Sequence, residues 1–268
     1  MKNQIAKVSL CLVLLVAAAC QQPADVNAAN DAVELRIVTS GGFAAAHDIL
    51  APQFERDSGI KLITEYGSSS GGSPTSIPAR LERGEKFDII ILADYSLENL
   101  TAAGYVRPES RRDLVLSKIG MAVREGAVIP DISTPERFIQ VMRDAESFGY
   151  SASASGTYLA TELFPRLGLW QEFEPKGKRI VGDRVGTIIA RGEVEIGFQQ
   201  VSEILPIAGV EFAGTIPDEY QLVTIFSAAI TAQSDHVAEA QRLLDYFTST
   251  EVADAVAATG LQPIPSGH

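Results

Sequence analysis

The most constraining feature of this chain is a regular alternation of short apolar segments with amphipathic ones. From position 33 onward the pattern predicts strands at 33–39, 60–66 and 87–93, with helices at 43–57 and 79–83 between them. The third strand, FDIIILA, is almost continuously apolar, which is typical of a strand buried on both faces of a parallel sheet. Strands that alternate with helices in this way predict an α/β fold.

A second series of strands and helices follows the basic pair Arg111-Arg112. It comprises predicted strands at 118–123, 148–153, 178–181 and 194–198 and predicted helices at 134–146, 157–167 and 185–191. A long strand at 221–232 and two helices, at 236–248 and 251–258, complete the chain. Because a helical ending needs a surface on which to pack, we expect it to return to the first lobe. The first lobe is then 33–117 plus 229–268, and the second lobe is 118–228.

The first residues differ from the rest of the chain. Lys2 and Lys7 precede the apolar run VSLCLVLLVAAA at 8–19, which ends at Cys20. This run is too short to span a membrane but suits the apolar region of a secretory signal peptide. Three alanines directly before a cysteine resemble a lipobox. We therefore expect a lipoprotein signal peptide at 1–19, lipidation of Cys20 and a polar tether at 20–32, with ordinary cleavage beside a chance cysteine as the alternative.

The number of cysteines and the net charge restrict the cellular location and the possible partners of the protein. The chain has two cysteines, and Cys11 lies inside the expected signal peptide, so the mature chain keeps only Cys20 and forms no internal disulfide. We expect an exported, periplasmic or cell-surface protein, anchored to a membrane by lipid alone. The formal net charge of −12 excludes nucleic acid and anionic membrane surfaces as partners. A bound anion must therefore be held by local dipoles or local cations.

Three loops rich in Ser and Gly each follow directly after a predicted strand. They are Ser40-Gly41-Gly42, the loop at 67–72 and the loop at 151–156. Ligands of open α/β sheets bind beyond the carboxyl ends of the strands, and unpaired N–H groups at helix starts attract anions. Ordinary turns and helix caps are the alternative interpretation. Because no loop contains a carboxylate to accept a proton, a fully ionised dianion such as sulfate, molybdate or tungstate fits better than phosphate.

The segment GSSSG at 67–71 also matches the G-x-S-x-G pattern of hydrolase nucleophiles. A catalytic triad would need a histidine after Ser69 at the edge of the sheet, but only His236 and His268 follow it. His236 is better explained as a surface residue at the start of a helix. A secreted serine hydrolase that uses Ser69 is therefore a remote alternative. No H-x-x-x-H or C-x-x-C spacing occurs, so we expect neither a metal site nor a cofactor.

Two polar pairs follow later predicted strands at the same rim. Asp183-Arg184 follows the strand at 178–181, and Gln199-Gln200 follows the strand at 194–198. A helix dipole disfavours a cation at the start of a helix. Arg184 is therefore either a surface cation or a donor that faces the ligand.

The order of elements, together with LRIVTSGGF, FERDSGIKLITEYGSSSGG, LERGEKFDIIILAD, SASASGTYLATELFPRLGLW and RGEVEIGFQQ, resembles the molybdate-binding proteins of ABC importers. The resemblance runs from about residue 33 to 263. It implies an α/β, two-lobed type II periplasmic binding protein, each lobe a mostly parallel sheet flanked by helices. It further implies a monomer without enzymatic activity that closes on a tetrahedral oxyanion such as molybdate or tungstate and delivers it to an ABC permease. Hinges are expected near Ser117 and Ala228.

The resemblance also implies which residues bind the ligand. One of the family's two serines falls on Ser69, whereas the other falls on Gly42, which has no hydroxyl. A backbone donor of the second lobe falls on Ser155, another falls near Arg184, and the family's tyrosine falls on Gln200. The expected ligand-binding residues are thus Ser40, Gly42, Ser69, Ser155, Arg184 and Gln200.

The family's hydroxyls are missing at Gly42 and Gln200, so the identity of the ligand is left open. Each lost hydrogen bond to a buried anion costs about 1.5–3 kcal/mol of affinity. The alternative to molybdate is a small organic carboxylate that uses the room left by Gly42 and a bidentate contact from Arg184.

Overall fold

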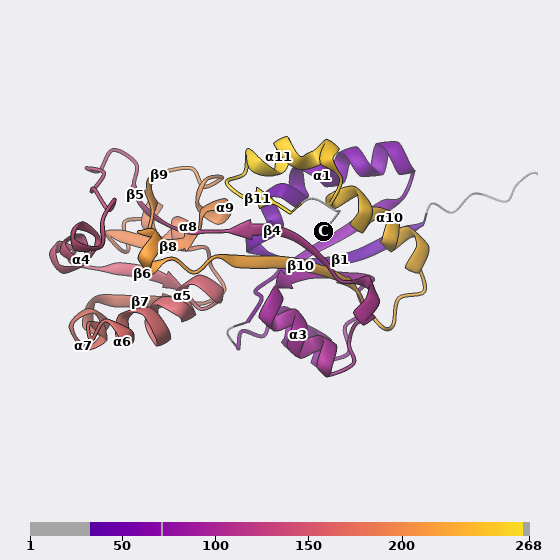
Figure 1. Ribbon diagram of the computed structural model, residues 1–268, viewed down its shortest axis with the longest axis horizontal. Helices are drawn as coiled ribbons and strands as arrows, with labels where there is room; N and C mark the ends of the chain where they lie inside the picture. Colours follow the sequence, from indigo (N-terminus) through magenta and orange to yellow (C-terminus); the bar gives the residue numbers. More distant parts are fainter. Residues whose placement is uncertain (1–32, 71, 265–268) are drawn as a thin grey trace, which may run out of the picture. The chain divides into compact units, whose positions relative to one another are not determined.

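The computed structural model describes residues 33–70 and 72–264, which are built around two mixed β-sheets flanked by helices (Figure 1). The two sheets and their helices confirm the expected α/β fold with two lobes. The expected signal peptide at 1–19, the lipidated Cys20 and the tether at 20–32 lie outside the described residues. Within the described residues, no helix is both long enough and apolar enough to cross a membrane.

The sheet of the first lobe has the strand order β11-β4-β10-β3-β1-β2. Strand β1 runs parallel to β2 and β3, whereas β10 runs antiparallel to β3 and β4. Every residue of β3 is buried, as its apolar run predicts. The strands are β1 (Glu34–Ser40), β2 (Lys61–Gly67), β3 (Ile89–Ala93), β4 (Arg112–Ser117), β10 (Thr224–Ile230) and β11 (Gln262–Pro263).

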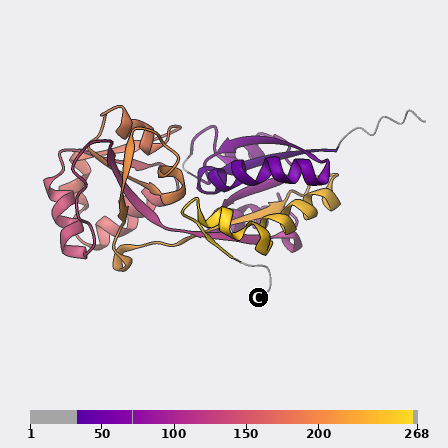
Figure 2. The same cartoon turned by 90° about the horizontal axis from the view of Figure 1, so that it is seen from above.

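Helices cover both faces of this first sheet (Figures 1 and 2). On one face, Phe43 of α1 packs edge-to-face on Phe247 of α10, with ring centroids 5.4 Å apart. On the other face, Leu81 of α2 and Leu97 of α3 pack against Ile90 of β3. The helices are α1 (Gly41–Ser58), α2 (Ile77–Glu82), α3 (Asp94–Ala102), α10 (Val237–Phe247) and α11 (Ala253–Ala257).

The sheet of the second lobe has the strand order β7-β6-β8-β5-β9. Strand β6 runs parallel to β7 and β8, and β5 runs antiparallel to β8 and β9. Its core is aromatic: the fully buried Phe164 contacts Phe138, Phe148 and Phe173. The strands are β5 (Ile119–Arg124), β6 (Phe148–Ser151), β7 (Gly177–Ile180), β8 (Ile196–Gln200) and β9 (Val210–Thr215).

The helices of the second lobe are mostly short. The segment predicted as one helix at 157–167 is a continuous helical run that contains a π-helical turn at Leu159–Leu163. The helices are α4 (Pro135–Asp144), α5 (Ala154–Tyr158), α6 (Phe164–Arg166), α7 (Trp170–Phe173), α8 (Val185–Ala190) and α9 (Val201–Ile204). Single 3-10 turns lie at Pro108–Ser110, Glu174–Lys176, Asp218–Tyr220 and Thr250–Val252.

The chain passes between the lobes twice. Strand β4 ends at Ser117 and β5 begins at Ile119, so the first passage lies between them. The second passage lies before Thr224, where β10 already pairs with β4 (Figure 1). The expected boundary at Ala228 is therefore too late, because Ala228 pairs with Ile91 inside the first sheet. The strand predicted at 221–232 contains no Gly or Pro that would mark where the sheet pairing begins.

Candidate functional site

A cavity of about 390 Å³ lies where the carboxyl ends of strands from both sheets meet. The segments after β1 and β2 line it from the first lobe, and those after β6, β7 and β8 line it from the second. All three Ser- and Gly-rich loops contribute to its wall. Five of the six expected ligand-binding residues line it, namely Ser40, Gly42, Ser69, Ser155 and Arg184.

Ser40 presents an unused hydroxyl to this cavity. It is the N-cap residue of α1, but its side chain makes no capping hydrogen bond. Its side-chain oxygen is buried and has no partner among the described residues. Buried polar groups are almost always hydrogen-bonded, so an orphaned hydroxyl on a cavity wall indicates a partner that binds there. The adjacent N-terminus of α1 adds a partial positive charge.

The other two serines are held in place by their own hydrogen bonds. The backbone N–H of Ala93 donates to Ser69 Oγ at 2.9 Å, which leaves the hydroxyl proton of Ser69 free to be donated. Ser155 Oγ lies 3.1 Å from Ser151 Oγ, which also accepts from the N–H of Gly156 at 3.2 Å. Ser69 is therefore a preorganised donor from the first lobe.

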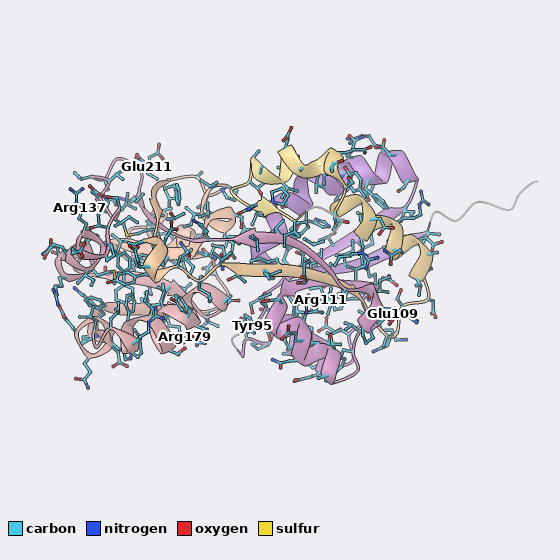
Figure 3. All side chains as sticks on the ribbon, in the orientation of Figure 1. Tyr95, Glu109, Arg111, Arg137, Arg179 and Glu211 are labelled. Atoms are coloured by element: carbon cyan, nitrogen blue, oxygen red, sulfur yellow. The ribbon has the colours of Figure 1, made fainter. Side chains whose placement is uncertain are left out.

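The loop that carries Ser69 is attached to α3. Ser70 Oγ lies 3.0 Å from the hydroxyl of Tyr95, at the start of that helix (Figure 3). A nucleophilic role for Ser69 would require a histidine, but neither His47 nor His236 lines the cavity. His47 Nε2 instead lies 3.2 Å from Thr64 Oγ1. No catalytic triad is assembled around Ser69 among the described residues.

Both glycines at the start of α1 are sites of close approach. A Cβ atom at Gly42 would overlap the ring of Phe226, and a Cβ atom at Gly41 would overlap Glu203 Oε1. The room that Gly42 was expected to leave for a larger ligand is thus filled by Phe226. The resemblance to the family indicated that position 42 lacks a hydroxyl, but it could not indicate that the ring of Phe226 occupies this space.

Arg184 is a cation on the cavity wall. It is the N-cap residue of α8 and forms no ion pair within 4 Å in the described segments 33–70 and 72–264. The adjacent Asp183 faces Arg191 instead, at 3.4 Å. Hydrogen bonding to His47 lowers the pKa of Asp48 in the first lobe, and the positive charge of Arg184 adds a smaller effect of the same sign. The same charge opposes the upward shift of the pKa of Glu203, which burial causes. Its guanidinium is available to an anionic ligand.

Glu203 is a cavity residue that the sequence patterns did not single out. It lies on α9 and lines the cavity, so the site contains a carboxyl although the three loops contain none. Gln199 Nε2 donates to Glu203 Oε1 at 3.0 Å. Burial raises the pKa of Glu203 to about 7, against the opposing effects of Arg184 and of hydrogen bonds from Gln199 and the backbone of Gln200. The site is therefore not composed of donors alone.

Gln200 does not line this cavity. Ser117 Oγ donates to Gln200 Oε1 at 2.7 Å, and Gln200 Nε2 donates to Thr224 Oγ1 at 3.1 Å. Both polar atoms of the amide are thus used at the two passages between the lobes. The neighbouring Gln199 faces the cavity instead, because successive residues of a strand point to opposite faces.

Comparison with known proteins agrees with the architecture. A family model described as bacterial extracellular solute-binding protein matches residues 35–262. The chain therefore belongs to the bacterial extracellular solute-binding proteins. It resembles the substrate-binding proteins of ABC transporters, as the sequence motifs indicate.

The names of individual relatives point to different ligands and activities. An aconitate isomerase from Pseudomonas sp is 41% identical over 239 residues, which are 89% of this chain and 91% of that relative. The molybdate-binding protein ModA of Azotobacter vinelandii is 24% identical over 246 residues, 87% of this chain and 91% of the relative. A solved structure of the periplasmic molybdate-binding protein of Azotobacter vinelandii has a TM-score of 0.71 at 21% identity. It covers 87% of this chain and 100% of that one, and it shows the same fold.

Restoring the family's hydroxyl at position 42 should damage the site. We expect Gly42→Ser to lower the free energy of unfolding by about 1–3 kcal/mol, because the new side chain overlaps Phe226. Urea denaturation measures this change. Ala45→Ser, which adds a hydroxyl elsewhere on α1, is the matched control and should cost less. A Gly42→Ser protein as stable as the native one would contradict the overlap.

The raised pKa of Glu203 predicts a pH-dependent stability. The folded protein holds the proton more tightly than the unfolded chain, in which the pKa is near 4.5. The resulting stabilisation is fully present below about pH 4.5 and is lost as the pH rises through about 7. We expect the free energy of unfolding of the native protein, measured relative to that of Glu203→Gln, to fall by on the order of 1–3 kcal/mol between pH 5 and pH 8.

Unfolding in urea at both pH values tests this expectation. Glu219→Gln, a change at an exposed residue, is the matched control and should follow the native protein at each pH. A stability difference between native protein and Glu203→Gln that does not change with pH would contradict the expectation.

Proposed function

We propose that this protein binds a small polycarboxylate, such as aconitate, in the cavity between its two lobes. The observation that carries the proposal is the guanidinium of Arg184 on the wall of the cavity, which also receives the unpartnered hydroxyl of Ser40. A guanidinium without a carboxylate partner matches the planar, bidentate geometry of a carboxylate. The likeness to an aconitate isomerase at 41% identity supports the same class of ligand.

The first lobe supplies the remaining donors. The orphaned hydroxyl of Ser40, the free proton of Ser69 and the N-terminus of α1 all lie at the cavity. One carboxylate of the ligand binds these donors while another binds Arg184 from the second lobe. A ligand with several carboxylates therefore contacts both lobes at once, which favours closure about the two passages between them.

Size disfavours a tetrahedral dianion by comparison. The cavity of 390 Å³ is equivalent to about 13 water molecules at ~30 Å³ each. A five-atom oxyanion leaves much of this space unfilled, whereas aconitate has twelve non-hydrogen atoms.

Molybdate or tungstate is the second candidate ligand. The serine hydroxyls and the α1 N-terminus favour it, since helix starts bind oxyanions without any cation. The relatives named as molybdate-binding proteins support this candidate too. In either case the protein acts as a monomeric receptor that delivers its ligand to an ABC permease.

A panel of ligands separates the two candidates. We expect cis- and trans-aconitate to raise the unfolding free energy by about 2.7 kcal/mol at one hundred times their dissociation constants. Molybdate, tungstate, sulfate and phosphate should give smaller shifts. Thermal unfolding of the domain that begins at residue 32 measures the stabilisation. A clear shift with molybdate or tungstate and none with any carboxylate would reverse the choice of ligand.

A variant of a cavity residue tests whether the ligand binds in this cavity. Ser40→Ala should weaken aconitate binding roughly tenfold to a hundredfold, as expected for one lost hydrogen bond to a charged group. Isothermal titration calorimetry measures the affinity. Ser133→Ala, at an exposed residue of the second lobe, is the control and should bind like the native protein.

The same proposal includes export and a lipid anchor at Cys20. In a bacterial host, we expect the full chain to incorporate labelled palmitate and to sediment with membranes. Cys20→Ser should remove the label and release the protein, whereas Cys11→Ser, inside the expected signal peptide, should do neither. Unchanged labelling of Cys20→Ser would rule out this anchor.

A further inference from the structure

We propose that Glu203 is a catalytic residue that moves a proton within an unsaturated polycarboxylate bound in the cavity, so that the cleft interconverts double-bond isomers. This inference rests on the proposed binding of a polycarboxylate. It adds a chemical step and a named base to that binding, and the likeness to an aconitate isomerase supports the class of reaction.

The orientation of the Glu203 carboxyl is fixed by a chain of hydrogen bonds. The backbone N–H of Val185 donates to Gln199 Oε1 at 2.9 Å, so the Gln199 amide must direct its NH₂ group the other way. That NH₂ group donates to Glu203 Oε1 at 3.0 Å. The second oxygen of Glu203 has no side-chain partner among the described residues, and the carboxyl also accepts a hydrogen bond from the backbone of Gln200.

The position of Glu203 is fixed against the opposite lobe. Its Oε1 lies where a side chain on Gly41 would stand, and the neighbouring Ser202 Oγ donates to the carbonyl of Gly42 at 2.7 Å. The carboxyl is thus carried by the second lobe but held beside the first turn of α1, next to Ser40. A ligand bound by these donors lies beside Glu203.

The charges around Glu203 suit a general base at neutral pH. Arg184, on the N-cap of α8, is the charged group that acts on it. Asp183 lines the same cavity but faces Arg191, and α1 presents no titratable side chain in its first turn. Burial raises the pKa of Glu203 to about 7, and a base with a pKa near the working pH transfers protons most effectively.

The proposed step is a proton shift across three carbons of a substrate such as aconitate, propene-1,2,3-tricarboxylate. The Glu203 carboxylate takes a proton from the methylene carbon, and the C–H electron pair moves through the double bond into the conjugated carboxylate. Glu203 then returns a proton to the far carbon of the former double bond. The double bond re-forms on the other side of the central carbon, Glu203 is again a carboxylate, and no oxidant or reductant is needed.

The same donors that bind the substrate stabilise the intermediate. Negative charge grows on a carboxylate of the substrate as the proton leaves, and Arg184 and the hydroxyl of Ser69 lie on the wall that receives it. Preorganised donors of this kind lower the barrier most when they face the oxygen on which charge develops. The cis or trans geometry of the product follows from the conformation in which the cavity holds this intermediate.

Glu203 also has a structural role that the test must separate from catalysis. It is the third residue of α9, the position from which a glutamate reaches back to the N-cap backbone. Glutamine retains an oxygen for that bond and nearly the same shape but does not accept a proton from carbon. Glu203→Gln therefore preserves the cap and removes the base.

The experiment follows cis- and trans-aconitate by proton NMR in D₂O with native protein, Glu203→Gln and Glu219→Gln. We expect native protein and Glu219→Gln to interconvert the isomers and to exchange the methylene protons for deuterium. Glu203→Gln should slow both processes by at least about 100-fold while its thermal shift with aconitate persists. The kcat/KM of the native protein should rise with pH through about 7, as a base that must be deprotonated requires.

Two results would overturn the inference. Native protein that is stabilised by aconitate but neither isomerises it nor exchanges its protons is a receptor alone, and the proposed binding then stands without catalysis. Exchange in Glu203→Gln at the native rate would assign the proton transfer to another group. Failure of any carboxylate to stabilise the native protein would instead refute the binding on which the step depends.

Discussion

The close approach of α9 to the first turn of α1 is the constraint on which the site depends. Gly41 allows it, because the space that a side chain would fill there is taken by Glu203 of α9. The hydrogen bond from Ser202 Oγ to the carbonyl of Gly42 joins the two helices. Without these contacts, the donors of the first lobe and the charged groups of the second would not line one cavity.

The electrostatics of the cavity follow from the parallel parts of the two sheets. The carboxyl ends of parallel strands meet at one edge, which gathers the Ser- and Gly-rich segments and their unpaired donors. To this donor set the second lobe adds the cation Arg184 and the carboxyls of Glu203 and of Asp183, the latter directed at Arg191. The raised pKa of Glu203 is the consequence of placing that carboxyl in a confined space where hydrogen bonds and Arg184 only partly offset its burial. Such shifts are common at sites where protons move.

Much of the fold could be predicted from hydrophobic periodicity, as the fully buried β3 illustrates. Strands β4 and β9 and helix α3 were not predicted, because no clear apolar period marks them. The serine loops of the cavity could be identified from their place after strands. The sequence could not decide whether Gln199 or Gln200 faces the cavity. Adjacent strand residues point in opposite directions, so the register of the strand determines which of the two does. Glu203 lies only a few residues after these glutamines, yet it could not be identified as a cavity residue. Its contact with Gly41 joins segments that are distant in the sequence, and no local pattern reveals such a contact.

The amide of Gln200 has a consequence for motion in this protein. It joins Ser117 and Thr224, one from each chain passage, and it is also the residue from which α9 begins. Gln200 is the last residue of β8, and the helix that follows it, α9, carries Glu203. We therefore expect a change in the angle between the lobes to displace the Glu203 carboxyl, so that the cleft opens and the only glutamate among its described lining residues moves at the same time.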